Sequence, residues 1–287
     1  MHQPAPRTAT STSKESASST ASPFRTAQTR PSCCCCTASR RPRTSTAACS
    51  TGSPPATGSS PPDHPGSGHT EAPAGYTYTF DRLADLTEGF VRALGLTRFA
   101  LYVFDFGAPV GFRVAERNPE WIAGLIVQNG NAYADGLSDA AIELLSQRPD
   151  MPGAEQRVRA ELTLDAVRAQ YVTGVPDQAL VAPDGWTLDH HFLERPGRRD
   201  AQAALLFDYH TNVESYDRWQ AWLRKHTPPA LIVWGEHDPF FTEAGARAYL
   251  RDLPDAELHL FGTGHFALET HVAEIAPLVA AFLDRTQ

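Results

Sequence analysis

The sequence predicts an α/β fold: a mostly parallel sheet flanked by helices, with a mainly helical insertion. From about residue 62, short apolar runs alternate with segments of helical spacing, and this alternation is typical of parallel sheets. Residues 131–225 break the alternation, since they are rich in Pro, Asp and aromatic residues and too long for a loop. We therefore expect a core formed by 62–130 and 226–287, with 131–225 inserted as a lid, or cap domain.

The individual elements follow from the spacing of apolar residues. Residues 80–94 carry apolar side chains at helical intervals, and the run at 99–104 is a short apolar strand that leads into a small-residue turn and a second helix. The lid would follow the strand at 122–127. Further strands are expected at 230–234 and 256–261, and further helices at 242–253 and 272–283.

Charge and cysteine content limit the classes of partner. The formal net charge is −8, but residues 1–60 hold seven of the basic residues and one acid, which leaves 18 basic and 32 acidic residues beyond them. An acidic body argues against nucleic-acid binding, and no stretch approaches the roughly 18 apolar residues of a membrane span. Residues 62–287 contain no cysteine, as in a reducing compartment. We expect a cytoplasmic protein with a small-molecule substrate and no membrane partner. The sequence leaves open whether the chain forms a homo-oligomer.

Three polar residues follow expected strands, at the sheet edge where α/β proteins bind ligands. Asp105 follows the first strand of the body, Asp238 follows the strand at 230–234, and His265 follows the last strand. A tight strand-to-helix turn would hold the Asp105 side chain above the sheet edge. Taken alone, Asp105 could be a helix N-cap and His265 a surface histidine. Together, a nucleophile, an acid and a base in this chain order predict a catalytic site.

Four motifs carry a resemblance to a known family. They are Asp63-His-Pro-Gly-Ser-Gly-His-Thr, Val103-Phe-Asp-Phe-Gly-Ala-Pro-Val-Gly, Gly235-Glu-His-Asp-Pro-Phe and Thr263-Gly-His-Phe-Ala-Leu-Glu-Thr. On these motifs, residues 62–287 resemble the α/β-hydrolase superfamily, in the branch of epoxide hydrolases and haloalkane dehalogenases. The resemblance implies that Asp105 attacks an electrophilic carbon and that His265, oriented by Asp238, activates the water that hydrolyses the resulting ester. It implies neither a cofactor nor a metal.

The resemblance also suggests the rest of the site. The backbone N–H of Phe106 would be one oxyanion donor. Epoxide hydrolases protonate the ring oxygen with lid tyrosines, for which the candidates are Tyr133, Tyr171, Tyr209 and Tyr216. Dehalogenases of this branch usually have Trp after the nucleophile, whereas Phe106 has no side-chain donor, so an epoxide is favoured over a haloalkane. Alternatives are a haloalkane dehalogenase, an ester or C–C hydrolase, and a catalytically dead binding protein with this fold.

Residues 1–61 do not fit this pattern. No Leu, Ile or Val precedes Leu83, and all five cysteines lie at 33–36 and 49, so we expect a segment without regular structure. A Ser/Thr/Pro-rich tail, a transit segment and a metal site at the four adjacent cysteines are alternatives. We favour a reading-frame slip, because shifting the codons at 33–36 by one nucleotide gives four leucines, which His-Gly can follow. That run resembles the strand and oxyanion loop beside the nucleophile strand. As written, the chain would then lack its N-terminal strands and be aggregation-prone and nearly inactive.

Overall fold

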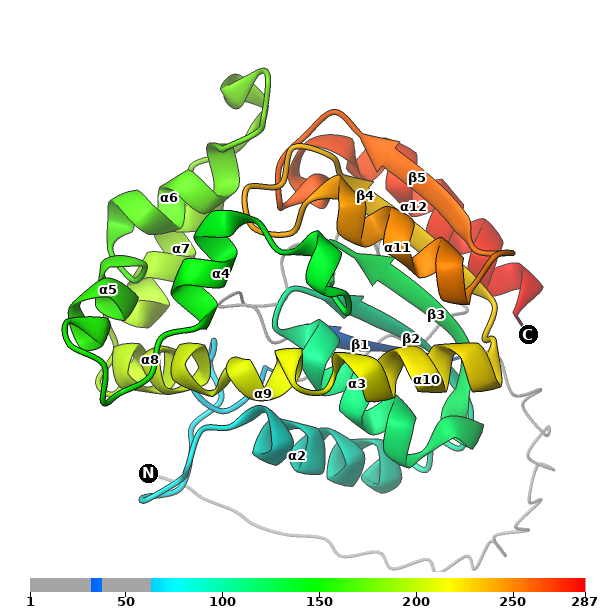
Figure 1. Ribbon diagram of the computed structural model, residues 1–287, viewed down its shortest axis with the longest axis horizontal. Helices are drawn as coiled ribbons and strands as arrows, with labels where there is room; N and C mark the ends of the chain where they lie inside the picture. Colours follow the sequence, from blue (N-terminus) through cyan, green and yellow to red (C-terminus); the bar gives the residue numbers. More distant parts are fainter. Residues whose placement is uncertain (1–31, 38–62, 287) are drawn as a thin grey trace, which may run out of the picture.

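A computed structural model describes residues 32–37 and 63–286, and its strands form one parallel sheet (Figure 1). The spatial order of the strands is their order in the chain, β1-β2-β3-β4-β5. The strands are β1 (Ser32–Thr37), β2 (Phe99–Phe104), β3 (Ile122–Gln128), β4 (Ala230–Gly235) and β5 (Glu257–Phe261). This parallel sheet flanked by helices is the fold class that the sequence predicts.

Helices cover both faces of the sheet, because successive strand residues point to opposite sides. Leu101 and Val103 of β2 belong to one apolar cluster, whereas Tyr102 and Phe104 belong to a second. The first cluster includes residues of α2 (Phe80–Ala93), α3 (Gly107–Arg117), α10 (Tyr216–His226) and α11 (Glu243–Asp252). The second includes residues of α12 (Ala267–Arg285). A parallel sheet buried on both faces requires such continuously apolar strands.

Between β3 and β4 the chain forms a series of helices. Ser138 and Thr163 act as N-caps, because their hydroxyls accept the backbone N–H groups of Ala141 and Ala166 and so fix where two of the helices begin. The helices gather on one side of the sheet (Figure 1). They are α4 (Asp139–Leu145), α5 (Ala154–Ala160), α6 (Leu164–Val172), α7 (Asp184–Leu193), α8 (Arg198–Asp208) and α9 (His210–Val213), and α10 follows them before β4. We call residues 131–225 the insertion.

Strand β1 corrects the expectation for the N-terminal segment. It pairs with β2 in parallel along its whole length, with Ser32 opposite Phe99 and Thr37 opposite Phe104. The expected absence of a neighbour for β2, and of regular structure, is therefore wrong for residues 32–37. The physical reason is that the backbone N–H and C=O groups of a buried strand need partners, and a ladder forms between backbones whatever the side chains. The expected His-Gly turn and the remainder of 1–61 lie outside the described residues.

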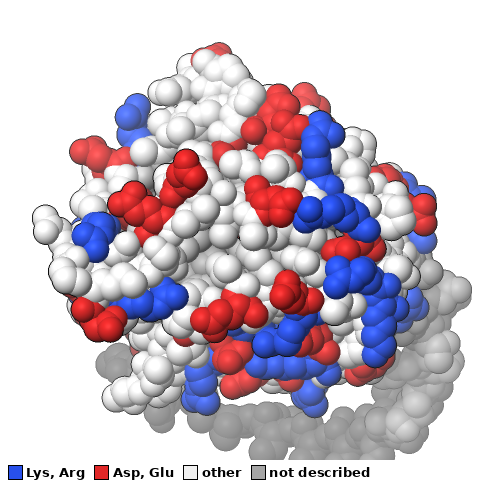
Figure 2. All heavy atoms as spheres, viewed as in Figure 1, with Lys and Arg blue, Asp and Glu red and all other residues white. Residues whose placement is uncertain are grey.

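The surface carries charges of both signs. Acidic and basic side chains are interspersed over the face shown in Figure 2. Arg117 of α3, for example, contacts Asp85 and Glu88 of α2 at 3.0 and 3.1 Å. Arg113 is buried and donates to Asn212 of the insertion at 2.7 Å, which ties α3 to α9. Among the described helices, none combines the length and the apolar character that crossing a bilayer requires.

The loop that opens the main body packs against α8. Gln202 donates to the carbonyl oxygen of Gly66 at 3.2 Å. Gly66 has φ +87, and a Cβ at this position would lie 2.8 Å from the Ala201 side chain, so a larger residue would be strained. The preceding His64 is buried, and burial lowers its pKa to about 4. His64 is therefore held neutral in the folded chain down to acidic pH.

We predict that His64 makes stability fall as the pH drops. Because its folded pKa lies below the ordinary value of about 6.5, the unfolded chain binds a proton first, and stability is lost between about pH 6.5 and 4. Urea unfolding measures how much unfolding free energy is lost between pH 7 and pH 4.5. This loss should be about 2–3 kcal/mol smaller in His64→Leu than in the parent. The readout is this difference in pH dependence, whatever the absolute stability of the variant. Parallel pH profiles would contradict the prediction.

Candidate active site

Asp105 occupies the turn between β2 and α3. Its φ is +48, a value that residues other than glycine rarely adopt. The turn is closed by the N–H of Ala108, which donates to the Asp105 carbonyl at 2.9 Å. Because Gly107 and Ala108 are small, α3 can begin directly behind the turn. The Asp105 side chain lines a pocket at the end of the sheet and is 21% exposed.

His265 lies between two carboxylates. Its Nδ1 is 2.7 Å from Oδ2 of Asp238, and its Nε2 is 3.7 Å from Oδ1 of Asp105. The His265 and Asp238 side chains are almost fully buried. A carboxylate at Nδ1 fixes the tautomer and the ring orientation, so that Nε2 faces Asp105. The structure thus brings together the three residues that the sequence places at the ends of β2, β4 and β5.

Asp238 is held by donors that sequence reasoning missed. Its Oδ1 accepts the backbone N–H groups of Phe240 and Phe241 at 2.8 and 3.1 Å. Its Oδ2 accepts Nδ2 of Asn129 at 2.8 Å, and the Oδ1 of Asn129 accepts the N–H of Gly235 at 3.0 Å. Buried charge is tolerated when it is hydrogen-bonded in this way. Asn129 follows β3 directly with φ +39, so it anchors Asp238 from the neighbouring strand.

The insertion touches the loops that carry Asp238 and His265. A Cβ on Gly264, beside His265, would lie 2.0 Å from a carbonyl oxygen of the insertion. A Cβ on Gly174, in the insertion, would lie 2.2 Å from the carbonyl oxygen of His237, beside Asp238. Gly174 has φ +79, which glycine adopts without strain. Backbone therefore packs directly on backbone here, and the position of the insertion is coupled to that of both loops.

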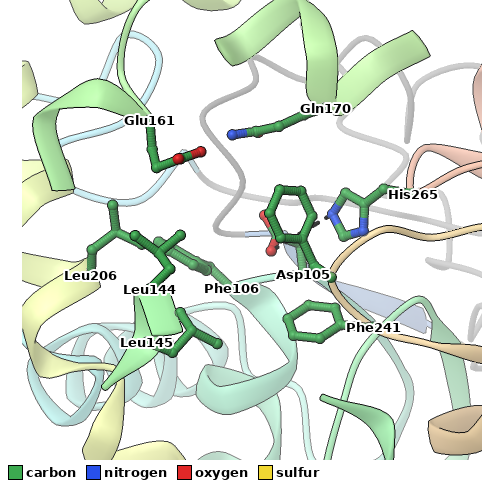
Figure 3. Close-up of a pocket in the computed structure, with 10 residues that line it drawn as sticks. Asp105, Phe106, Leu144, Leu145, Glu161, Gln170, Leu206, Phe241 and His265 are labelled. Carbon is green, nitrogen blue, oxygen red and sulfur yellow. Dashed lines mark ion pairs between the residues drawn. The ribbon is translucent and has the colours of Figure 1, made fainter. Parts of the chain in front are cut away.

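The pocket in front of Asp105 has an apolar wall from each side of the molecule (Figure 3). The core contributes Phe106, Phe240 and Phe241 beside Asp105 and His265. The insertion contributes Leu144, Leu145 and Leu206, together with two polar side chains, Glu161 and Gln170. An apolar pocket with a few convergent polar groups is typical of a small-molecule site.

Tyr133 and Tyr171 face other carboxylates. The hydroxyl of Tyr133 donates to Asp252 at 2.7 Å, and that of Tyr171 donates to Asp189 at 2.5 Å. Burial and the bond to Asp252 raise the pKa of Tyr133 far above its usual range. Neither tyrosine lines the pocket. Their role as the proton donor therefore stays a prediction, and in this structure both hydroxyls are hydrogen-bonded to those carboxylates.

Tyr209 and Tyr216 belong to the first apolar cluster, which also contains Phe106. The Tyr209 ring packs against Phe106 with centroids 5.8 Å apart, and the Tyr216 hydroxyl accepts Nδ2 of Asn131 at 3.2 Å. Both tyrosines are buried, and burial raises the pKa of Tyr209 well above its usual value and that of Tyr216 to about 12. Neither is among the lining residues. The structure thus places none of the four candidates in the pocket.

The oxyanion donor expected at Phe106 lies at the start of α3. Phe106 is the N-cap of this helix, and N–H groups in a first turn have no acceptor within the helix. The second expected donor, after β1, lies outside the described residues. Within the described ranges, no group of three or more His, Cys, Asp or Glu is arranged to hold a metal ion.

Comparison with known proteins identifies the family. The profile of a family described as alpha/beta hydrolase fold matches residues 62–272. The chain belongs to this family. The match begins where the sequence pattern becomes regular. A hydrolase of Saccharomyces cerevisiae, itself uncharacterized, is 40% identical over 220 residues, which is 75% of this chain and 76% of the relative. The chain is therefore an enzyme, a hydrolase of the α/β fold.

More distant α/β hydrolases extend the comparison. The 2-hydroxymuconate semialdehyde hydrolase of Pseudomonas putida is 24% identical over 224 residues, covering 77% of this chain and 75% of the relative. Among solved structures, the haloalkane dehalogenase DbeA of Bradyrhizobium elkani has a TM-score of 0.69 at 17% identity and covers 91% of this chain and 92% of its own. The meta-cleavage product hydrolase of Pseudomonas fluorescens has a TM-score of 0.70 at 15% identity, covering 90% and 92%. At these identities the structures show the shared fold.

We predict that removing the Asn129 side chain destabilises this hydrolase. Asn129→Gly keeps the left-handed backbone but leaves Asp238 and the Gly235 N–H with one hydrogen bond fewer each. Loss of partners for buried polar groups should cost about 1–3 kcal/mol of unfolding free energy, measured by urea denaturation at pH 7. Asn129→Ala should cost more, because alanine also strains the positive φ. Parental stability in Asn129→Gly would contradict this anchoring role.

Proposed function

We propose that the chain hydrolyses a small apolar electrophile, an epoxide in preference to a haloalkane, through a covalent ester on Asp105. One observation carries the proposal: a carboxylate occupies the strained turn where the nucleophile of this fold stands, 3.7 Å from a histidine that is itself held by a second carboxylate. A serine at this turn would favour acyl transfer. A carboxylate that attacked an acyl carbon would form a labile anhydride, so an alkyl carbon is the better electrophile.

The reaction would proceed in two steps. In the first, an Oδ of Asp105 attacks the electrophilic carbon, and the bond to the leaving group breaks. In the second, Nε2 of His265 takes a proton from water, which attacks the ester carbonyl of Asp105. The intermediate collapses and expels the alkyl oxygen, which takes the proton back from His265. Asp238 stabilises the imidazolium between these proton transfers.

The pocket supports an apolar substrate with an oxygen leaving group. Its walls are mostly leucine and phenylalanine, which suits an alkyl or aryl chain. The insertion supplies half of these walls and would act as the lid over the bound substrate. Phe106 carries no side-chain donor for a departing halide. A haloalkane therefore remains the second candidate, supported by the fold that the chain shares with the haloalkane dehalogenase.

His265→Gln should trap the intermediate. The first step needs no base, so the Asp105 ester should form, and it should accumulate because its hydrolysis needs Nε2 of His265. Intact-mass spectrometry after incubation with a panel of terminal epoxides and bromoalkanes should show one adduct per chain. Peptide mapping should place it on the peptide that contains Asp105.

Two matched variants complete this experiment. Asp105→Ala in the His265→Gln background should form no adduct. His191→Gln, which changes an exposed histidine of α7, should turn over at the parental rate and accumulate nothing. Adducts spread over surface side chains, or none with any member of the panel, would count against the proposed function.

A further inference from the structure

Two polar side chains of the insertion face the nucleophile across the pocket. Glu161 is the C-cap of α5, and Gln170 lies in α6. Both line the same pocket as Asp105 and are half-buried. Figure 3 shows both side chains directed into the pocket from the insertion, with the Gln170 amide and the Glu161 carboxyl pointing toward one another. The other insertion residues that line the pocket are leucines, so these two provide the polarity of that wall.

Opening an epoxide requires a proton for the ring oxygen, and the described lining residues leave few sources for it. Asp105 is the attacking group and must be ionised. His265 must be neutral at Nε2 to serve as the base in the second step. Phe106 has no side-chain donor. The amide of Gln170 can donate a hydrogen bond but does not release a proton. Glu161 is the remaining lining residue whose side chain can deliver a proton.

We propose that Glu161 is the catalytic acid of the first step and that Gln170 orients the same oxygen; this rests on the proposed function. The Asp105 Oδ–carbon bond forms as the ring carbon–oxygen bond breaks, and the electron pair of that bond stays on the ring oxygen. The oxygen takes the proton from a carboxyl oxygen of Glu161. The Gln170 amide donates a hydrogen bond to the developing alkoxide. A carboxylic acid at the C-cap of α5 would thus take the role for which the resemblance suggested a tyrosine.

The protons balance over a turnover. Hydrolysis of the ester consumes one water. One of its protons passes through His265 to the alkyl oxygen that leaves Asp105. The other remains on the regenerated Asp105 carboxyl, and through solvent it restores the acid form of Glu161. The net reaction is epoxide plus water to a vicinal diol, and both carboxyl groups return to their starting states.

Glu161 also defines the class of substrate. An oxygen leaving group needs a proton, whereas a halide departs as an anion without one. The geometry therefore favours strained cyclic ethers with an apolar substituent over haloalkanes of the same size.

The test compares first-step rates for two matched substrates. In the His265→Gln background, adduct formation on Asp105 is followed by mass spectrometry with 1,2-epoxyhexane and with 1-bromohexane. Adding Glu161→Gln should slow the epoxide reaction about 100-fold, within the usual range for loss of a general acid. The rate of adduct formation with the bromide should stay within about threefold of the rate in His265→Gln alone, because bromide leaves without taking a proton. Gln170→Leu should slow the epoxide reaction about tenfold, because the developing alkoxide loses one hydrogen-bond donor.

Glu155→Gln is the matched control, because it changes an exposed carboxylate on the same helix and should leave both rates unchanged. Circular dichroism and thermal melts confirm that each variant is folded. A parental epoxide rate in Glu161→Gln would overturn the role of Glu161 while leaving the Asp105 ester intact. An equal slowing of both substrates would show a structural effect and also overturn it. Absence of any adduct in His265→Gln alone would instead remove the proposed function itself.

Discussion

The site depends on one buried hydrogen bond, between Nδ1 of His265 and Oδ2 of Asp238 at 2.7 Å. A carboxylate with no exposed surface is stable when its oxygens are fully hydrogen-bonded, and Asp238 accepts from two backbone N–H groups and from Asn129 as well. These donors come from its own loop and from the end of β3. Because β3, β4 and β5 are neighbours in the sheet, Asn129, Asp238 and His265 meet at one edge.

The same edge receives the strained turn of Asp105. Its positive φ costs energy that the surrounding structure must supply, and β2 is fully buried between β1 and β3. The insertion also contacts this edge of the sheet, because its backbone packs on the loops at Gly264 and His237 without intervening side chains. Catalytic geometry and the position of the insertion are thus determined together. Substitutions in the insertion, far from Asp105 in sequence, can for this reason alter the site.

Much of the fold was accessible from the sequence because apolar spacing reports which residues are buried. The expected strand at 99–104 coincides with β2, and the expected helix at 80–94 differs from α2 by one residue. The last helix begins earlier than expected, at Ala267, because α12 merges two helical segments across a kink at His271. The written side chains at 32–37 show no strand pattern, and only the shifted reading frame suggested a strand beside β2 at this position; the ladder of β1 with β2 is made by backbone groups.

The site was partly accessible for a related reason. Polar residues directly after apolar strands identified Asp105, Asp238 and His265. The same rule identifies Asn129, which follows the expected strand at 122–127 and was overlooked because an amide suggests no reaction. Glu161 could not be found in this way. It caps a short helix of the insertion, where no apolar period shows which side chain turns toward the pocket.

The proposed Asp105 ester is tested most directly by following the oxygen atom of the attacking water through a single turnover. Excess enzyme would react with 1,2-epoxyhexane in water enriched in oxygen-18. If Asp105 forms the ester and water attacks its carbonyl carbon, the label enters the Asp105 carboxyl, and the diol carries ordinary oxygen. Mass spectrometry of the peptide and of the product reads both positions. Label in the diol, with none in the Asp105 peptide, would mean that water attacks the substrate directly and would contradict the account.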